Sequence, residues 1–350
     1  MEGGGPAHRG CPLIVRALGI ETSCDETATA LVEADASGLK LIAQQLATRP
    51  EESAALGGIV PELTVRQHLE LLPKIARGVL AQGPLDAVGA TAGPGLAPAL
   101  LVGLAFGKSL AWARQTSFHA INHLEGHIFS PFVSRGKWPE YPHLALIASG
   151  GHTLLVDAPD SSRPTVVGCT RDDAAGEAFD KLARMVGLGY PGGPEIEKEA
   201  TTGEVGKIKL PRPMKGSDKG DFSFSGLKNA ARLLLEREPG IGQPGTLRAH
   251  FCAEAQAAIA ECLADRCRLA LRRTGRKLLT VSGGVSANRV VARSLEEAAR
   301  AEGARLLAPA PGWNTDNAAM IAAVTARRHL DGAKSDWDTD ADPRWSVDSG

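Results

Sequence analysis

One pattern occurs twice in the chain: a short apolar run, a turn of small polar residues, and a second apolar run. The first copy is IVRALGI at 14–20 followed by TATALV at 27–32, and the second spans 144–156 as LALIAS, GGHT and LLV. Apolar runs on either side of a small polar turn predict paired strands. The copies share the pattern rather than the letters, and their recurrence predicts a duplicated fold.

The segments around these hairpins alternate between helical and strand patterns. Helical spacing occurs at 62–80, where Pro73 predicts a kink, and at 98–113. Strands are expected at 86–94, 277–284 and 304–308, and further helices at 174–187, 245–273, 286–302 and 316–330. Strands that alternate with helices predict an α/β protein.

Charge and cysteine content exclude several classes of protein. Lys and Arg number 39 against 40 Asp and Glu, so a globally basic nucleic-acid coat is excluded while a local basic patch is not. The six cysteines form no CxxC pair, which predicts reduced thiols in the cytosol. No signal peptide and no apolar run of about 18 residues is found, so we predict a cytoplasmic protein without a membrane segment.

The segment HLEGH at 123–127 carries a histidine pair. His123 and His127 are four residues apart, which places both on one helix face within reach of one metal ion. Two ordinary histidines lining a helix are the alternative. In the metalloprotease motif HExxH the glutamate follows the first histidine directly, whereas Glu125 comes one position later and is rotated by about 100°. Peptidase geometry is therefore not reproduced, although a metallopeptidase remains an alternative.

Two glycine-rich turns are candidates for anion binding. SGGHT at 149–153 allows backbone N–H groups to approach an anion, but a plain tight hairpin explains it as well. SGGVSANR at 282–289 follows a strand and opens a helix, with Ser286 as the expected N-cap and Asn288 available to a base or ribose. Neither a GxxxxGK[ST] loop nor a dinucleotide fingerprint is present.

One single carboxylate and two clusters of carboxylates complete the candidates. Asp316 precedes the last helix and is either a third ligand for the histidine pair or, with Thr315, a simple helix cap. The pattern of DDAAGEAFDK at 172–181 is typical of a solvated helix start, where carboxylates complement the helix dipole. Asp180 lies deeper in the expected helix and is less easily explained in this way. GIETSCDET at 19–27 crowds carboxylates and hydroxyls in one turn, where Asp25 and Glu26 are candidates for a general base.

Taken in order, these motifs resemble the family of TsaD, the tRNA threonylcarbamoyladenosine transferase formerly described as a glycoprotein endopeptidase. The resemblance covers about residues 16–330, and the chain departs from the usual family pattern at ELTVRQH near 62–68. Further segments that carry the resemblance are GGIVPEL at 57–63, TAGPGL at 91–96, YPGGP at 190–194, PRPM at 211–214, DFSFSGLK at 221–228 and TDNAAMIA at 315–322. It implies an actin-like, sugar-kinase-type ATPase fold with two similar lobes around a cleft. We expect the following division: a disordered head at 1–15, an N-terminal lobe at 16–133, a linker at 134–143, a C-terminal lobe at 144–312, a closing helix at 313–330 that returns to the N-terminal lobe, and a largely unstructured polar tail at 331–350.

The resemblance also implies a site and a reaction. Metal ligands are His123, His127 and Asp316, for one divalent ion, with Fe²⁺ preferred over Zn²⁺. The nucleotide and acyl-adenylate contacts it implies are Ile147, Ala148, Ser149, Gly150, Gly151, Asp180, Gly193 and Asn288, together with Glu197 where many relatives have an aspartate. The implied reaction moves the threonylcarbamoyl group from threonylcarbamoyl-AMP to N6 of adenosine 37 in tRNAs reading codons that begin with A. ATP or ADP is an alternative occupant of the same cleft.

The implied partners are tRNA, TsaB-like and TsaE-like proteins, and a separate synthase that supplies threonylcarbamoyl-AMP. A basic cluster is the candidate tRNA contact, with a solvated loop as the alternative: Lys207, Lys209, Arg212, Lys215, Lys219 and Lys228. Three other functions stay open, namely a metallopeptidase, a small-molecule kinase of the same fold, and a non-catalytic partner subunit. The presence of both histidines and Asp316 argues against the last of these.

Overall fold

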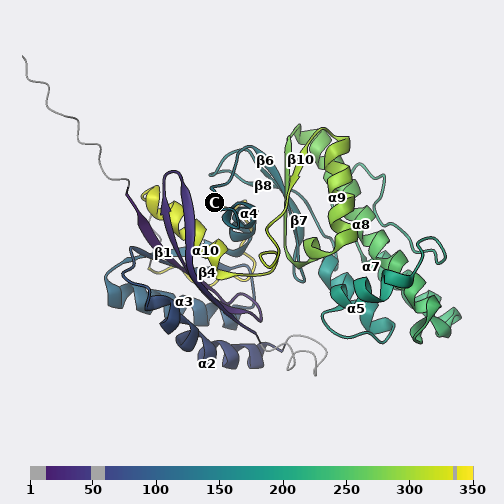
Figure 1. Cartoon of the computed structure of the whole chain (residues 1–350), viewed down its shortest axis with the longest axis horizontal. Helices are drawn as coiled ribbons and strands as arrows, with labels where there is room; N and C mark the ends of the chain where they lie inside the picture. The colour runs from purple at the N-terminus through teal and green to yellow at the C-terminus, as the bar shows by residue number, and fades with distance from the viewer. Residues whose placement is uncertain (1–12, 49–59, 334–336, 350) are drawn as a thin grey trace, which may run out of the picture.

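The computed structural model describes residues 13–48, 60–333 and 337–349, so most of the predicted head lies outside the described residues. The chain forms two lobes, each built on a five-stranded mixed sheet with helices packed against it (Figure 1). No helix within the described residues combines the length and apolarity needed to cross a membrane. The five cysteines in this part of the chain are free thiols, and three of them are buried.

The N-terminal lobe contains a sheet in the order β3-β2-β1-β4-β5. Strand β1 is antiparallel to β2 and parallel to β4, which in turn is parallel to β5. The elements of this lobe are β1 (Val15–Glu21), β2 (Thr27–Asp35), β3 (Gly38–Ala47), α2 (Pro61–Leu80), β4 (Ala87–Gly93), α3 (Ala97–Arg114) and β5 (Ser117–Asn122).

The C-terminal lobe repeats this arrangement. Its sheet, read from its other edge, has the order β8-β7-β6-β9-β10, with β6 antiparallel to β7 and parallel to β9, and β9 parallel to β10. The duplicated fold predicted from the two hairpins is therefore confirmed. The strands are β6 (His143–Ala148), β7 (Thr153–Ala158), β8 (Thr165–Cys169), β9 (Leu278–Ser282) and β10 (Arg305–Leu307).

Helices of the second lobe follow β8 and enclose one apolar core with its sheet. The 29-residue helix α8 is central to this core, because nearly every position from Phe251 to Leu263 is buried. The helices are α5 (Ala175–Met185), α6 (Gly192–Glu199), α7 (Ser225–Arg237), α8 (Thr246–Thr274) and α9 (Arg289–Ala301), with 3₁₀ turns η1 (Ala200–Thr202), η2 (Pro239–Gly242) and η3 (Gly284–Ala287).

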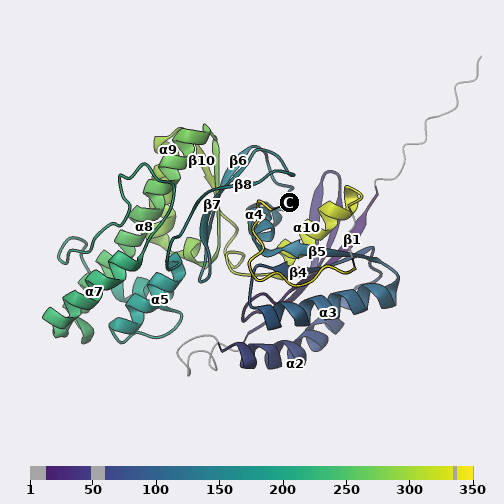
Figure 2. The same cartoon turned by 180° about the vertical axis from the view of Figure 1, so that it is seen from behind.

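Two layers of helices cover the first sheet. Helices α2 and α3 pack on one face, whereas α10 (Ala318–Leu330) packs on the other, beside α4 (His123–Val133) (Figures 1 and 2). A side chain at Gly19 of β1 would place its Cβ 2.3 Å from the backbone nitrogen of Ala322. The glycine thus permits direct contact between β1 and α10, which brings the chain back to its first lobe.

The C-terminal tail is more ordered than the sequence suggested. We expected a largely unstructured segment, but Trp337 stacks on Phe118 with ring centroids 5.7 Å apart, and the backbone N–H of Asp342 donates to the carbonyl of Ala92 at 2.8 Å. Val347 is buried between α4 and strands of the second sheet. Two isolated apolar side chains and a backbone hydrogen bond supply these contacts, and none of them has a periodicity that a sequence pattern could reveal.

Candidate functional site

Helix α4 presents the histidine pair at the junction of the lobes. Asn122 ends β5 and caps the helix, since its Oδ1 accepts a hydrogen bond from the N–H of Leu124 at 2.9 Å. His123 and His127 then follow one turn apart, with exposed fractions of 3% and 1% and ring centroids 4.7 Å apart. Strand end, cap and helical spacing together fix both imidazoles on one side of α4.

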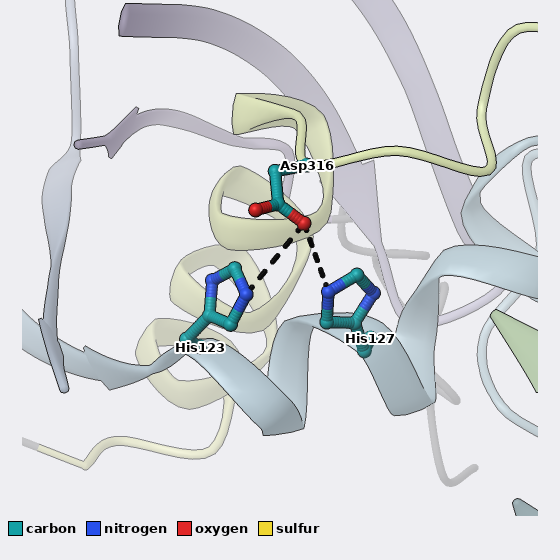
Figure 3. A group of neighbouring side chains, drawn as sticks. All are labelled: His123, His127 and Asp316. Atoms are coloured by element: carbon teal, nitrogen blue, oxygen red, sulfur yellow. Dashed lines mark hydrogen bonds and ion pairs between the residues drawn. The ribbon is translucent and has the colours of Figure 1, made fainter. Parts of the chain in front are cut away.

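Asp316 faces this pair from the loop before α10. Its Oδ1 lies 3.1 Å from Nε2 of His127 and 3.6 Å from Nε2 of His123 (Figure 3). The alternative in which Thr315 or Asp316 caps α10 is wrong, because Asn317 is the N-cap and accepts a hydrogen bond from the N–H of Met320. With the cap supplied by its neighbour, the Asp316 carboxylate is available to the histidines.

The donor set fits a divalent metal ion. The three ligand atoms of His123, His127 and Asp316 lie within 4.8 Å of one another. Donors bound at about 2.0–2.2 Å to one tetrahedral ion are separated by roughly 3–3.5 Å, which is close to the separations found between Asp316 and the imidazoles. Two imidazole nitrogens and one carboxylate oxygen suit Fe²⁺ or Zn²⁺ and leave coordination positions for a substrate.

The charges of the group compensate one another. Burial lowers the pKa of His123, but the carboxylates of Glu21 and Asp316 outweigh burial and raise this pKa to about 9. Burial raises the pKa of Asp316, yet the two imidazoles bring it well below its usual range. Burial likewise raises the pKa of Glu21, but His123 and the hydrogen bond from Ser23 together bring this pKa below its usual value. The imidazole of His123 and the carboxylates of Glu21 and Asp316 therefore stabilise each other's charged forms at a buried position.

Glu125 lies on a different face of α4 from the histidines. Its carboxylate forms an ion pair with the guanidinium of Arg328 on α10. The sequence predicted a glutamate rotated away from the histidine pair, and this ion pair gives it a different partner. The carboxylate of HLEGH is thus engaged with α10 and is not positioned as the base of a metalloprotease.

The β1–β2 turn contributes a second cluster next to Asp316. The ligand atoms of Cys24, Asp25 and Glu26 lie within 4.8 Å of one another. Burial raises the pKa of Glu26 well above its usual range, and the nearby carboxylates of Asp316 and Asp25 raise it further. The two predicted candidates for a general base therefore lie beside the histidine–aspartate group.

The β6–β7 turn occupies the equivalent place in the second lobe. Strand β6 ends with Ile147 and Ala148, and the turn closes where the N–H of Ser149 donates to the carbonyl of His152 at 2.8 Å. A Cβ added at Gly150 or Gly151 would meet nothing within 4 Å, so the backbone of this turn is open. His152 brings the turn next to the candidate metal ligands, since its ring lies 6.1 Å from that of His123. Burial and the two imidazoles of α4 lower the pKa of His152 to about 4.

The second glycine-rich segment packs against the end of β6. Gly283 has a φ of +90°, and a Cβ there would lie 2.2 Å from the carbonyl oxygen of Ala148. The predicted N-cap Ser286 is wrong: η3 precedes α9, and Asn288 is the cap, accepting from the N–H groups of Val290 and Val291. The Asn288 amide also donates to Gln256, so both of its ends are engaged within the protein.

The remaining predicted nucleotide residues lie around α6. The carboxylate of Asp180 accepts from the N–H of Gly192 at 2.7 Å, next to Gly193 in the first turn of this helix. Burial raises the pKa of Asp180. Glu197 accepts from both the backbone N–H and the side chain of Arg289, which joins α6 to α9. Since α5 contacts α6 and η3, and β6 contacts η3, the predicted nucleotide residues gather in one region of the second lobe.

The predicted basic cluster is largely neutralised. Arg212 forms ion pairs with Glu254 and Glu261 of α8, and Lys215 shares Glu261. Lys228 pairs with Asp173, and Lys207 lies 3.5 Å from Glu204. The segment is thereby fixed to α8, an arrangement that the sequence did not indicate because the partners lie about 40 to 50 residues further along the chain.

Fold and site together define a two-lobed α/β protein of the actin-like class with a candidate metal-ligand group at the junction of its lobes. The structures it is similar to include HypF from T. kodakarensis, with a TM-score of 0.55, 14% identity and coverage of 92% of this chain and 49% of that one. A second is full-length HypF in the phosphate- and nucleotide-bound form, with a TM-score of 0.56, 12% identity and coverage of 93% and 57%. At these identities the likeness concerns the fold alone.

Sequence comparison gives the family. Residues 40–323 match the family model of TsaD, tRNA N6-adenosine threonylcarbamoyltransferase. The chain is 44% identical over 349 residues to the tRNA N6-adenosine threonylcarbamoyltransferase of Rhodospirillum rubrum, with 95% of each chain covered. It is 45% identical over 317 residues to that of Bordetella petrii, with 89% of this chain and 90% of the relative covered. The chain belongs to the TsaD family.

Sequence reasoning missed three contributors to this site. The sequence pattern assigns His152 only to a turn, our predictions contain no cap for α4 at Asn122, and they contain no partner for Glu125, which the structure shows to be Arg328. An Asn directly before an apolar helix is a cap signal that could have been read. The other two depend on contacts between segments far apart in the chain.

Proposed function

We propose that this chain transfers the threonylcarbamoyl group of threonylcarbamoyl-AMP to N6 of adenosine 37 in tRNAs reading codons that begin with A. The bond from the carbamoyl carbon to the phosphate oxygen breaks, the bond from that carbon to N6 forms, AMP leaves, and N6 gives up a proton. The observation that carries the proposal is the group of His123, His127 and Asp316, which lies beside the open β6–β7 turn in a chain of the TsaD family.

His123, His127 and Asp316 would hold one divalent ion, with Fe²⁺ the first candidate and Zn²⁺ the second. When bound, such an ion supplies Lewis-acid orientation and polarisation of the carbamoyl group. Both imidazoles are buried, which limits the access of water to their side of the site, whereas Asp316 is partly exposed. Asp25 and Glu26 lie next to the group and are the candidates for accepting the proton of N6.

The adenylate would lie in the second lobe. The open backbone at Gly150 and Gly151 allows a phosphate to approach its N–H groups, next to Ile147, Ala148 and Ser149. Gly193 and Glu197 of α6, with Asp180 and Asn288, surround the place where the nucleoside would lie. ATP or ADP would compete for the same region. The partners that fit this reaction are tRNA, a synthase that supplies the adenylate, and TsaB-like and TsaE-like proteins.

The test is product formation. The chain is incubated with tRNA, threonine, bicarbonate, ATP, the synthase and the partner proteins, and the tRNA nucleosides are analysed by mass spectrometry. We expect threonylcarbamoyladenosine with wild type and none with His123→Ala, while neither protein cleaves a glycoprotein. Peptide cleavage that disappears in His123→Ala, without a nucleoside product from wild type, would overturn the proposal and restore the peptidase.

A further inference from the structure

Glu21, the last residue of β1, is a buried carboxylate in contact with a metal-ligand candidate. Its exposed fraction is 1%. It accepts hydrogen bonds from the backbone N–H of Ser23 at 2.6 Å and from the hydroxyl of Thr91 at 2.7 Å, and its Oε2 lies 2.9 Å from Nδ1 of His123. A buried carboxylate is costly unless its oxygens are hydrogen-bonded, and these partners offset that cost.

The arrangement of these partners determines which nitrogen of His123 keeps its proton when the other nitrogen binds a metal ion. A carboxylate only accepts hydrogen bonds, so Nδ1 of His123 must be the donor to Glu21. The other nitrogen, Nε2, then lies on the side of the ring that faces Asp316, at 3.6 Å. A histidine that donates from one nitrogen to a carboxylate offers its other nitrogen as a metal ligand with a fixed ring orientation.

The two histidines of the pair differ in this respect. Among the described residues, Nδ1 of His127 is buried without a hydrogen-bond partner, whereas Nδ1 of His123 has both Glu21 and the hydroxyl of Ser23, at 3.2 Å, within reach. Of the two Nδ1 atoms, only that of His123 therefore contacts a carboxylate from a second element. Because Glu21 ends β1 and His123 begins α4, the contact also connects the first strand of the N-terminal lobe to helix α4.

We propose that Glu21 is a positioning residue that holds His123 with its proton on Nδ1 and its Nε2 directed at the metal ion. The proposal rests on the proposed function, since it concerns the ion that His123, His127 and Asp316 would hold. Loss of such a partner typically weakens metal binding by about 10–100-fold. Glu21 itself contacts neither the ion nor the substrate in this assignment.

The first experiment uses Glu21→Gln, which keeps the size of the side chain. An amide has one accepting oxygen and one donating NH₂ group. If the NH₂ group faces Ser23, it opposes the backbone N–H of Ser23, which is also a donor. If it faces His123, Nδ1 of His123 must accept a hydrogen bond, and the ring proton moves to Nε2, between the ring and the ion. Zn²⁺ affinity of the metal-free protein, measured by competition with a chromophoric chelator, should fall by about 10–100-fold.

The matched control is Ser23→Ala, which removes the hydroxyl near Nδ1 but keeps the backbone donor to Glu21. We expect it to bind Zn²⁺ within a few-fold of wild type. Circular dichroism and thermal melts of the metal-free proteins establish that both variants are folded. Wild-type Zn²⁺ affinity in folded Glu21→Gln would refute the positioning role.

The second experiment needs no substitution and decides the matter even if Glu21→Gln fails to fold. Nitrogen chemical shifts of histidines labelled with ¹⁵N, recorded on the Zn²⁺-loaded wild type, should show His123 protonated on Nδ1 and metal-bound through Nε2. A proton on Nε2 would overturn the inference alone. Absence of Zn²⁺ binding by wild type would instead refute the metal site of the proposed function, and this inference with it.

Discussion

The β1–β2 turn and the β6–β7 turn hold the same position in two sheets of the same topology, yet they carry opposite chemistry. The first contains Cys24, Asp25 and Glu26 and lies next to Asp316. The second contains Gly150 and Gly151, whose backbone is open on the side where a Cβ would be. Duplication has copied the strand pairing, while the side chains of each turn differ.

The difference shows how one fold can supply two kinds of binding place. A turn rich in carboxylates suits cations and protons, whereas a glycine turn offers backbone N–H groups to an anion. The two meet because His152 of the second turn lies 6.1 Å from His123 of α4, which itself contacts Glu21 at the end of β1. An acyl phosphate placed between the turns would have its phosphate and its reacting carbon in different surroundings.

The largest effect is expected from removal of one of the three candidate metal ligands, which lie beside the carboxylate-rich β1–β2 turn. His127→Ala should lose its metal on purification, and transfer should fall below detection, because two donors cannot replace three in a buried site. Elemental analysis and the nucleoside assay measure both. The control is Glu125→Ala on the same helix, which should keep its metal because Glu125 pairs with Arg328. Full stoichiometric metal in His127→Ala would contradict the assignment.

A smaller effect is expected from the general-base candidates of the β1–β2 turn. Glu26→Gln or Asp25→Asn should lower kcat by about 10²–10⁴-fold while metal content is unchanged, because a base acts on the proton and not on the ion. The control is Asp35→Asn, at the far end of β2, which should leave kcat unchanged. If both turn variants keep wild-type kcat, the base lies outside this turn.

A substitution in the β6–β7 glycine turn should change the affinity for nucleotide and leave the metal content unchanged. Gly150→Val should fold, since the added side chain meets no neighbour, but it should weaken calorimetric binding of ADP by about tenfold or more, because one charge-assisted hydrogen bond contributes about 1.5–3 kcal/mol. Gly242→Val, equally open but in η2, is the matched control. An unchanged affinity in folded Gly150→Val would contradict the predicted phosphate position.

The smallest effect is expected on stability, from a change in the C-terminal tail. This tail packs on the N-terminal lobe and has no counterpart among the described residues of the C-terminal lobe. Trp337→Ala should lower the free energy of unfolding by about 1–2 kcal/mol, because Trp337 is 43% exposed and loses its ring contacts with Phe118 and Trp112. Urea unfolding measures the change, and Trp112→Ala, exposed to 77%, should cost less. Transfer per folded molecule should stay at the wild-type level, and a large loss of activity would place the tail in the mechanism.

Much of the fold could be predicted because it is encoded locally. Alternating apolar runs gave both hairpins, and helical periodicity gave α2, α3 and α8 close to their observed bounds. The histidine pair was also a local signal, since the spacing of His123 and His127 fixes their common face in any helix. Errors arose where the signal was weak, as at Ser286, where a 3₁₀ turn moves the helix start to Arg289.

The sequence by itself therefore determined the repeat of the hairpin, many of the strands and helices, and the types of side chain available for chemistry. Strands β3, β5 and β8 were not among the predicted elements. Only the tertiary structure decided the partners of these side chains: Asn317 caps α10 and leaves Asp316 to the histidines, Glu21 contacts a residue 102 positions away, and Arg212 is neutralised by α8. The physical reason is that periodicity acts over a few residues, whereas hydrogen bonds and ion pairs form wherever packing brings donor and acceptor together.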